Sequence, residues 1–233
     1  MNTICVIPVR GGSKGIPRKN VAEIVDGVCL LEWTIRQARG AYPVEDIVVS
    51  TEDAEMARIA AACGVQVVPR PPELAQDAST TASVVEHLLA QIDPEGRRFH
   101  AIAILQVTSP LRTVGDILSA KELMASGRYD SVVSACEETA RHPAKMYFLE
   151  AGCAVSVAPS YECSRRQDLP KVFRRNGAIF VVTREHFDRT GRLWGGRTGL
   201  VQMPGERSVD IDAPPDLEAA RRFLSSRPTE GLR

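Results

Sequence analysis

Residues Ile7–Asn20 read IPVRGGSKGIPRKN, and they continue an apolar run, Thr3–Val9, that we predict to be a strand. The loop after this strand contains three glycines and four cations, which are Arg10, Lys14, Arg18 and Lys19. Glycine lets backbone N–H groups approach an anion closely, and cations neutralise the charge of that anion. A loop of this composition at the carboxyl end of a strand predicts a phosphate-binding site at the edge of a sheet.

This loop matches neither of the two common nucleotide-binding motifs. The dinucleotide pattern G-x-G-x-x-G is absent, and Lys14 precedes Gly15 instead of standing in the G-K-[S/T] of a P-loop. A glycine-rich turn can also be purely structural. Four cations within ten residues, directly after a first strand, favour a phosphate site over that structural interpretation.

The composition is that of an ordinary globular protein. The chain has 233 residues, of which 44% are hydrophobic and 25% are charged, and its net charge is zero. We therefore expect a single domain over residues 1–233 with no nucleic-acid partner. No run approaches the ~20 apolar residues of a membrane span, and the apolar start is too short for a signal peptide. Six scattered cysteines without a C-x-x-C pair favour a reduced, cytoplasmic protein with no membrane partner.

Short apolar runs alternate with helical patterns along the chain. The predicted strands are Thr3–Val9, Ile47–Ser50, Gln66–Val68, Ala101–Leu105 and Ser131–Ala135. The predicted helices are Leu30–Arg39, Ala54–Cys63, Thr80–Ile92 and Val114–Ser126. Near-continuous apolar strands suit a parallel sheet that is covered on both faces, so this order predicts a Rossmann-like, three-layer α/β sandwich.

The alternation breaks between His142 and Arg175, where Arg, Pro, Ser and Cys are frequent and periodicity is weak. We interpret residues 142–175 as a small excursion from the main domain that could form an oligomer contact. Four further elements are predicted after it: a strand at Ala178–Thr183, extended pieces at Leu200–Met203 and Ser208–Ile211, and a last helix at Pro214–Leu224.

A second motif, QVTSPLR, occupies Gln106–Arg112 directly after the predicted strand Ala101–Leu105. It also lies at a carboxyl strand end, so we expect it to face the same crevice as the first loop. The same residues could instead form only a turn that leads into the next helix, and the residues alone leave both interpretations open.

The third motif is SVDID at Ser208–Asp212, in which Asp210 and Asp212 alternate. Alternate residues of an extended segment point the same way, so the two carboxylates would share a face. Adjacent carboxylates repel unless a cation joins them, and hard oxygen ligands of this kind suit Mg²⁺. The alternative is that an aspartate caps the last helix, because Asp212 stands where a cap would.

Cations and amides also gather within the irregular stretch, in the segments HPAK, RRQ and RRNG that contain Lys145, Arg166 and Arg174. A guanidinium pairs with a carboxylate through two hydrogen bonds, so this density suggests recognition of an acidic small molecule. The alternative is an exposed or interface-facing basic surface. His87, His100 and His186 have no partners at metal-ligand or triad spacing, so we assign no histidine base.

Together these motifs resemble the acylneuraminate cytidylyltransferases, or CMP-sialic acid synthetases. The similar segments follow the family's order over nearly the whole chain: IPVRGGSKGIPRKN, VVSTED, RPPELAQDAST, LQVTSPLR, SVVSACE, HPAK, FRRNGAIF and SVDID. The resemblance implies a Rossmann-like nucleotidyltransferase fold with a mostly parallel sheet and a small dimerisation extension, in a homodimer. It also implies transfer of CMP from CTP to the anomeric hydroxyl of a nonulosonic (sialic-type) acid, with Mg²⁺ as cofactor and release of pyrophosphate.

The resemblance implies a role for each matching position. The nucleotide would contact Arg10, Gly11, Gly12, Ser13, Lys14, Lys19 and Asn20, with Arg70 and Thr81 near the cytosine. The acidic acceptor would contact Gln106, Ser109, Arg166, Arg174 and, from the neighbouring subunit, Lys145. Asp210 and Asp212 would hold Mg²⁺, and the catalytic residues would be Arg10, Lys14 and Asp212.

Three positions depart from the family's usual motifs. Val107 and Arg175 each replace a proline, and Phe180 replaces a tyrosine. Val107 should mainly cost turn rigidity, whereas Phe180 removes a hydroxyl and Arg175 adds charge beside the sugar site. The CTP half of the expected site is intact, but a phosphonate or another acidic acceptor remains an alternative. A non-catalytic nucleotide-binding protein is a third hypothesis, against which Lys14, Asp210 and Asp212 argue.

Overall fold

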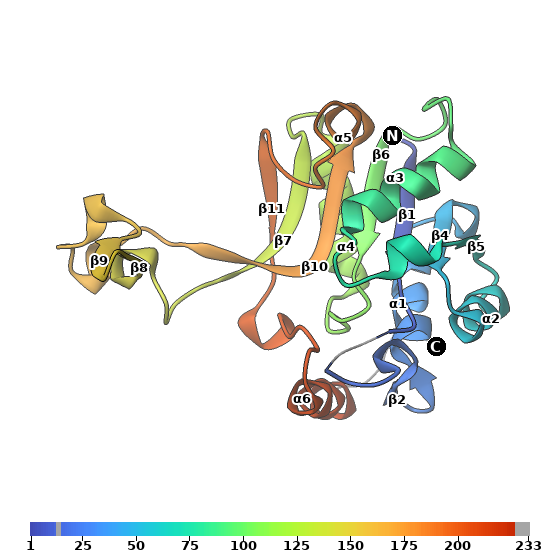
Figure 1. Ribbon diagram of the computed structural model, residues 1–233, viewed down its shortest axis with the longest axis horizontal. Coiled ribbons are helices and arrows are strands. Elements are labelled where there is room, and N and C mark those ends of the chain that lie inside the picture. The colour runs from blue at the N-terminus through green and yellow to red at the C-terminus, as the bar shows by residue number, and fades with distance from the viewer. Residues whose placement is uncertain (13–14, 227–233) are drawn as a thin grey trace.

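A seven-stranded mixed sheet forms the centre of the protein in the computed structural model, which describes residues 1–12 and 15–226 (Figure 1). Its strand order is β11-β7-β10-β6-β1-β4-β5. The strands are β1 Thr3–Pro8, β4 Ile47–Thr51, β5 Gln66–Pro69, β6 Ala101–Leu105, β7 Ser131–Glu137, β10 Phe173–Thr183 and β11 Thr198–Gln202. All of these strands run parallel except β10, which is antiparallel to both of its neighbours, β6 and β7.

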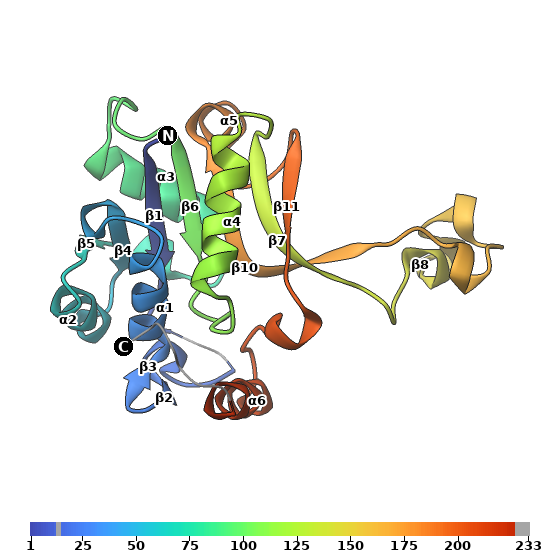
Figure 2. The same ribbon diagram turned by 180° about the vertical axis from the view of Figure 1, so that it is seen from behind.

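Helices cover both faces of this sheet. These helices are α1 Leu30–Arg39, α2 Ala54–Ala62, α3 Thr81–Ile92, α4 Val114–Ala125 and α5 Arg184–Thr190, whereas α6 Pro214–Ser225 lies below the sheet in Figure 1. Buried side chains of α1, α2 and α4 pack on one face, and those of α3 and α5 pack on the other (Figures 1 and 2). Along β1, Cys5 and Ile7 belong to the first core, and Ile4 and Val6 belong to the second. A strand that is buried on both sides needs an apolar side chain at every position, which explains its continuous apolar run.

The predicted α/β fold is therefore confirmed, and side chains cap the starts of α2 and α3. The Asp53 carboxylate accepts hydrogen bonds from the backbone N–H groups of Glu55 and Met56 at the start of α2. The Thr80 hydroxyl accepts one from Ser83 at the start of α3. Each cap satisfies N–H groups that have no partner inside their helix.

Some elements differ from the prediction. A small hairpin, β2 Glu23–Val25 and β3 Val28–Cys29, and helix α5 were not predicted. The expected extended piece Ser208–Ile211 lies outside the strands, because the chain leaves the sheet after β11 through a 3-10 turn at Gly205–Arg207. None of the helices in the described residues is long and apolar enough to cross a membrane.

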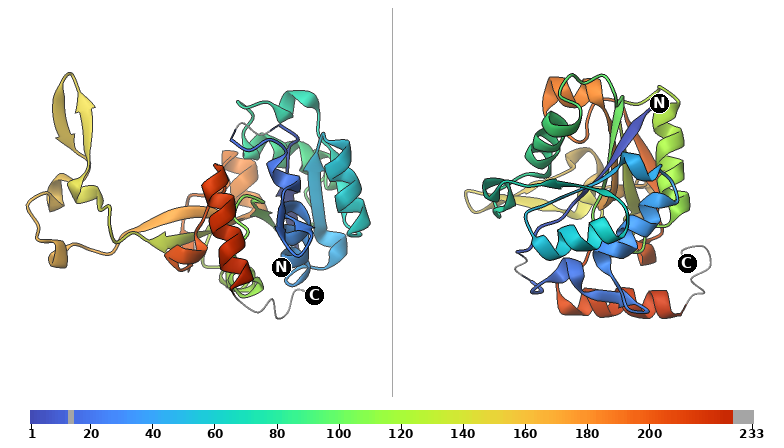
Figure 3. Two further views of the ribbon diagram at one scale, coloured as in Figure 1. Left: turned by 90° about the horizontal axis from the view of Figure 1, so that it is seen from below. Right: turned by 90° about the vertical axis from the view of Figure 1, so that its right-hand side faces the viewer.

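An arm, residues 138–172, extends from the ends of β7 and β10 away from the sheet (Figures 1 and 3). Its tip is an antiparallel hairpin of β8 Tyr147–Glu150 and β9 Cys153–Ser156. Large apolar side chains of the arm face solvent: Met146, Tyr147, Phe148, Leu149, Val155, Val157 and Tyr161. The arm therefore exposes apolar surface that a folded chain would normally bury.

Candidate active site

A cavity of about 350 Å³ lies where the sheet ends at the carboxyl side of β1 and β6. The predicted site residues that line it are Arg10, Lys19, Asn20, Arg70, Thr81, Gln106 and Asp212. They come from five separate parts of the sequence, and the sheet brings them together as expected for ligand sites at carboxyl strand ends. Asp77, Thr80 and Thr108 also line the cavity, and no role was predicted for them.

The glycine-rich loop, residues 10–20, is anchored at both of its ends. Val9 donates a backbone hydrogen bond to the carbonyl of Ser50, and the buried Asn20 side chain donates one to the carbonyl of Arg10 (3.0 Å each). Within the loop, Gly15 lies so close to the backbone of Asp212 that an added Cβ would overlap its carbonyl oxygen. This close approach, which only glycine permits, joins the loop to the SVDID segment. Ser13 and Lys14, predicted to bind nucleotide, lie outside the described residues.

The three described cations of the loop each contact a carboxylate of the protein. The pairs are Arg10 with Asp77 at 2.8 Å, Lys19 with Asp212 at 3.2 Å, and Arg18 with both Asp53 and Glu55. The backbone N–H of Gly11 likewise donates to the Glu52 carboxylate at 2.6 Å. The hydrogen bond from Arg18 holds the pKa of Asp53 below its usual value. Carboxylates thus occupy several donors that a phosphate would use.

The structure excludes one of the two interpretations of Asp212, namely that its carboxylate caps the last helix. The carboxylate that caps α6 is that of Asp216, which accepts hydrogen bonds from the N–H groups of Asp212 (3.1 Å) and Ala213 (2.8 Å). The side chain of Asp212 is 80% exposed, lines the cavity and contacts Lys19. Its carboxylate is therefore available to a ligand and takes no part in capping the helix.

Asp210 lies close enough to Asp212 for the two charges to interact. Desolvation by surrounding protein raises the pKa of Asp210, and the Asp212 charge raises it further, against an opposing hydrogen bond with Thr108. The backbone N–H of Ile211 donates to the Thr108 carbonyl at 2.8 Å, which fixes this segment beside the end of β6. Two carboxylates with an unfavourable mutual charge fit a divalent cation that also takes oxygens from a substrate. Within the described residues, no cluster of three or more metal-ligating side chains is found.

The motif Gln106–Arg112 is a tightly bonded turn around a buried guanidinium. Nη1 of Arg112 donates to the carbonyls of Gln106 (2.6 Å), Ser109 (3.0 Å) and Ala178 (3.2 Å). Burial lowers the pKa of Arg112 to about 10. The turn points Gln106 into the cavity, whereas Ser109 is buried behind it and does not line the cavity.

The other predicted acceptor residues lie on or beside the arm. Lys145 and Arg166 line a second cavity, of about 630 Å³, at the base of the arm. Nζ of Lys145 donates to the carbonyls of Glu162 and Ser164, and Arg166 donates to that of Thr139. Arg174 contacts Cys136 and Glu138. A single chain therefore does not bring these three cations to the first cavity.

Two of the three unusual positions, Arg175 and Phe180, contact the same residue, Trp194. The guanidinium of Arg175 lies 4.1 Å from the ring centre of Trp194, which in turn lies 5.6 Å from the ring of Phe180. Trp194 is outside every segment that carried the resemblance, so no sequence signal indicated it. A cation over an aromatic face is a stable arrangement that fixes the Arg175 side chain.

The family model described as Cytidylyltransferase matches residues 4–223 of the 233. The chain belongs to the cytidylyltransferase family. The match includes the glycine-rich loop, the turn around Arg112 and the SVDID segment, which together surround the first cavity.

Among the relatives, N-acylneuraminate cytidylyltransferase of Streptococcus agalactiae serotype V is 36% identical to this chain over 219 residues. N-acylneuraminate cytidylyltransferase A of Danio rerio is 34% identical to it over 221 residues. The matches cover 93% of this chain but only 52% and 49% of those proteins, so the chain spans about half their length. A Campylobacter coli protein named post-translational flagellin modification protein B is 28% identical, with 96% and 95% of the two chains covered.

Two solved structures share the fold of this chain. CMP:2-keto-3-deoxy-manno-octonic acid synthetase complexed with CTP superposes with a TM-score of 0.73 at 17% identity, covering 97% of this chain and 99% of that one. A 4-diphosphocytidyl-2C-methyl-D-erythritol synthase gives 0.64 at 16% identity, with 96% and 99% covered. At these identities the likeness extends to the fold alone.

Proposed function

We propose that this cytidylyltransferase transfers CMP from CTP to the anomeric hydroxyl of a nonulosonic acid and releases pyrophosphate. The observation that carries the proposal is the first cavity, where two loop cations, Arg10 and Lys19, face Asp212 and Gln106. The names of the relatives from S. agalactiae and D. rerio support an N-acylneuraminate-type acceptor.

In this reaction the acceptor oxygen bonds to the α-phosphorus of CTP as the bond from that phosphorus to the leaving pyrophosphate breaks. The step needs alignment and charge neutralisation more than covalent help from the protein. Arg10 and Lys19 would bind phosphate oxygens, and Gln106, fixed by the turn around Arg112, would bind the acceptor. Arg70, which is largely buried and donates to the Ser50 carbonyl at 2.8 Å, would border the base.

Asp210 and Asp212 are the residues that would hold Mg²⁺. When bound, the ion would neutralise phosphate charge and lower the pKa of the attacking hydroxyl. Asp212 already contacts Lys19, so one carboxylate borders both the expected metal and the expected phosphates. This arrangement agrees with the preference of Mg²⁺ for one or two carboxylates together with substrate oxygens.

A pyrophosphate-release assay with CTP tests the function directly. We expect release with one or more members of a panel of nonulosonic acids, dependent on Mg²⁺ and absent with ATP, GTP or UTP. Release with phosphonates alone would favour the alternative acceptor class. If no acceptor of the panel gives pyrophosphate release while CTP binding is retained, the hypothesis of a non-catalytic nucleotide-binding protein is favoured.

We also propose that two copies associate through the arm, which would complete the acceptor site with Lys145 and Arg166 of the second copy. The apolar side chains of the hairpin support this, because a monomer would leave them in water. Leu149 at the hairpin is 82% exposed. A second copy bound at the hairpin would also explain why Lys145 and Arg166 lie on the arm, away from the first cavity of their own chain.

The change Leu149→Glu should therefore produce a monomer in sedimentation velocity, since a charge cannot be buried there without a partner. KM for the acceptor should rise while CTP binding is retained. Leu118→Glu, on the exposed face of α4, is the control and should stay dimeric. A wild-type protein that sediments as a monomer at assay concentration would contradict the dimer.

A further inference from the structure

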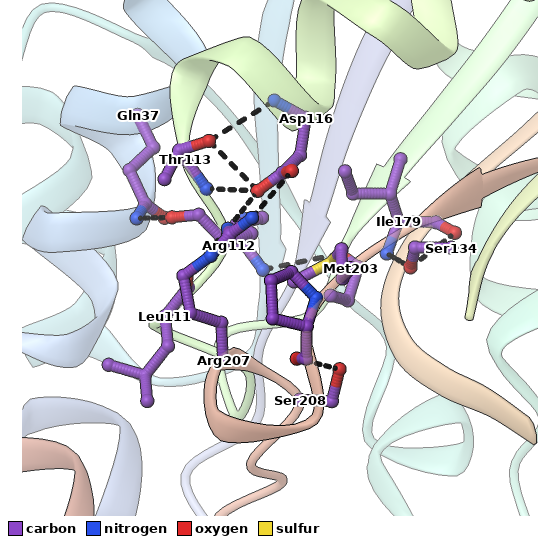
Figure 4. A network of polar contacts seen from close by, with 12 residues as sticks. Gln37, Leu111, Arg112, Thr113, Asp116, Ser134, Ile179, Met203, Arg207 and Ser208 are labelled. Atoms are coloured by element: carbon purple, nitrogen blue, oxygen red, sulfur yellow. Dashed lines mark hydrogen bonds and ion pairs between the residues drawn. The ribbon is translucent and has the colours of Figure 1, made fainter. Parts of the chain in front are cut away.

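A buried ion pair that no motif indicated lies beside the turn around Arg112. Arg207 and Asp116 are 91 residues apart in the sequence, yet Nη2 of Arg207 lies 3.1 Å from one carboxylate oxygen and Nη1 contacts the other (Figure 4). Their side chains are only 14% and 10% exposed. A two-point contact between a guanidinium and a carboxylate fixes orientation as well as distance.

One end of this pair belongs to the rigid start of α4. The Asp116 carboxylate also accepts hydrogen bonds from the N–H of Thr113 (2.7 Å) and from its hydroxyl (2.9 Å), in the capping box of the helix. Thr113 directly follows Arg112, whose guanidinium holds the turn that presents Gln106. Asp116 is therefore fixed relative to the acceptor side of the cavity.

The other end belongs to the segment that carries the two aspartates. Arg207 precedes Asp210 by three residues, and its Nη1 also lies 3.4 Å from the Leu111 carbonyl. The next residue, Ser208, accepts a hydrogen bond from the buried Asn176 side chain at 2.8 Å. Asn176 in turn accepts one from Ser134 at 2.6 Å. Residues 204–208 are thus attached to α4, β7 and β10 at once.

We infer that Arg207 is a positioning residue, which holds Asp210 and Asp212 at the distance from Gln106 and the glycine-rich loop that Mg²⁺ and CTP require. This inference rests on the proposed function. After β11 the chain has left the sheet, so no strand pairing fixes residues 208–212. Their place depends on the contacts of Asp212 with Lys19 and Asp216, on the Ile211–Thr108 backbone contact and on the Ser208–Asn176 contact. The Arg207–Asp116 pair adds the contact that ties the segment to the start of α4.

The Arg207–Asp116 pair is expected to contribute little to the stability of the fold. A buried ion pair often adds little to stability compared with apolar side chains of similar size, because both ions lose their hydration. The pair also fixes the orientation of the segment that carries Asp210 and Asp212. Groups that orient metal ligands affect metal affinity even when they never touch the ion.

The test compares two variants with a matched control. Arg207→Met removes the charged contact, and Arg207→Lys keeps the charge but loses the two-point geometry. The control is Arg184→Met, which breaks a pair of similar burial between Arg184 and Asp93 (3.1 Å; 15% and 5% exposed). That pair joins the start of α5 to the end of α3, at the opposite end of the strands from the first cavity.

Two quantities are measured for each protein: the Kd for Mn²⁺ in the presence of CTP and no acceptor, from the electron paramagnetic resonance signal of free Mn²⁺, and the Tm. Arg207→Met should weaken Mn²⁺ binding roughly tenfold or more, as for other residues that orient metal ligands. Arg207→Lys should restore part of that loss. Arg184→Met should lower Tm comparably and leave the Mn²⁺ affinity unchanged.

Equal Mn²⁺ affinity in wild type, Arg207→Met and Arg184→Met, with only Tm lowered, would reduce the pair to a structural contact and overturn the inference. Where Arg207→Met does not fold, Arg207→Lys decides between the same two outcomes. Wild-type protein that binds no Mn²⁺ with CTP would overturn the inference and the metal role together. Failure of the nonulosonate panel alone, with Mn²⁺ binding intact, would affect only the proposed acceptor.

Discussion

Asp212→Asn is expected to lower kcat about a thousandfold, whereas the fold and CTP binding should change little. Metal ions contribute several kcal/mol to such reactions, and each ~1.4 kcal/mol corresponds to a factor of ten in rate. Asparagine keeps the shape of the side chain but removes the charge that would hold Mg²⁺. The fold should be unaffected, because Asp212 is exposed and Asp216 caps α6.

Steady-state pyrophosphate release as a function of Mg²⁺ concentration measures this effect. The control is Glu218→Gln, which makes the same chemical change on the exposed surface of α6, outside the first cavity. It should behave like wild type. A kcat for Asp212→Asn within threefold of the control would exclude Asp212 from the metal site.

Arg112→Met is expected to have the largest effect on stability, with a loss of about 3 kcal/mol in the free energy of unfolding. The substitution leaves the carbonyls of Gln106, Ser109 and Ala178 without their shared donor. Removing a buried charge relieves part of this cost, but the three bonds to a charged donor outweigh that relief. For a chain of this size the Tm should fall by roughly 6–12 °C.

Thermal unfolding followed by circular dichroism gives the Tm, and acceptor kinetics report on Gln106. KM for the acceptor should rise more than KM for CTP, because the turn positions Gln106 and not the glycine-rich loop. Arg58→Met, on the exposed side of α2, is the control for loss of an arginine. An unchanged Tm for Arg112→Met would mean that solvent or a neighbouring group replaces the guanidinium.

Much of the fold could be predicted because burial on two faces imposes a simple pattern. Strands β1 and β6 are apolar at nearly every position, β4 is buried along its whole length, and α2 and α3 carry recognisable caps. The direction of β10 could not be predicted in the same way. An antiparallel strand in the middle of a sheet is buried on both faces like its parallel neighbours, so its composition carries no information on direction.

The candidate site was predictable where its residues follow strands directly, as Arg10 and Gln106 do. Partners that meet only through tertiary structure could not be predicted. Nothing in the sequence indicated that Asp216, and not Asp212, caps α6, or that Asp116 meets Arg207 across 91 residues. The position of the arm cations could not be predicted either, because their distance from the first cavity depends on where the arm points.

The carboxylates that contact the glycine-rich loop affect how an anionic ligand can enter. Asp77, Asp53, Glu55 and Asp212 already neutralise the described cations Arg10, Arg18 and Lys19. A triphosphate that binds these cations therefore exchanges one set of anions for another and does not meet bare positive charge. Selectivity among anions therefore depends on which anion fits the cations better than these carboxylates do. The displaced carboxylates then become free to repel a second anion.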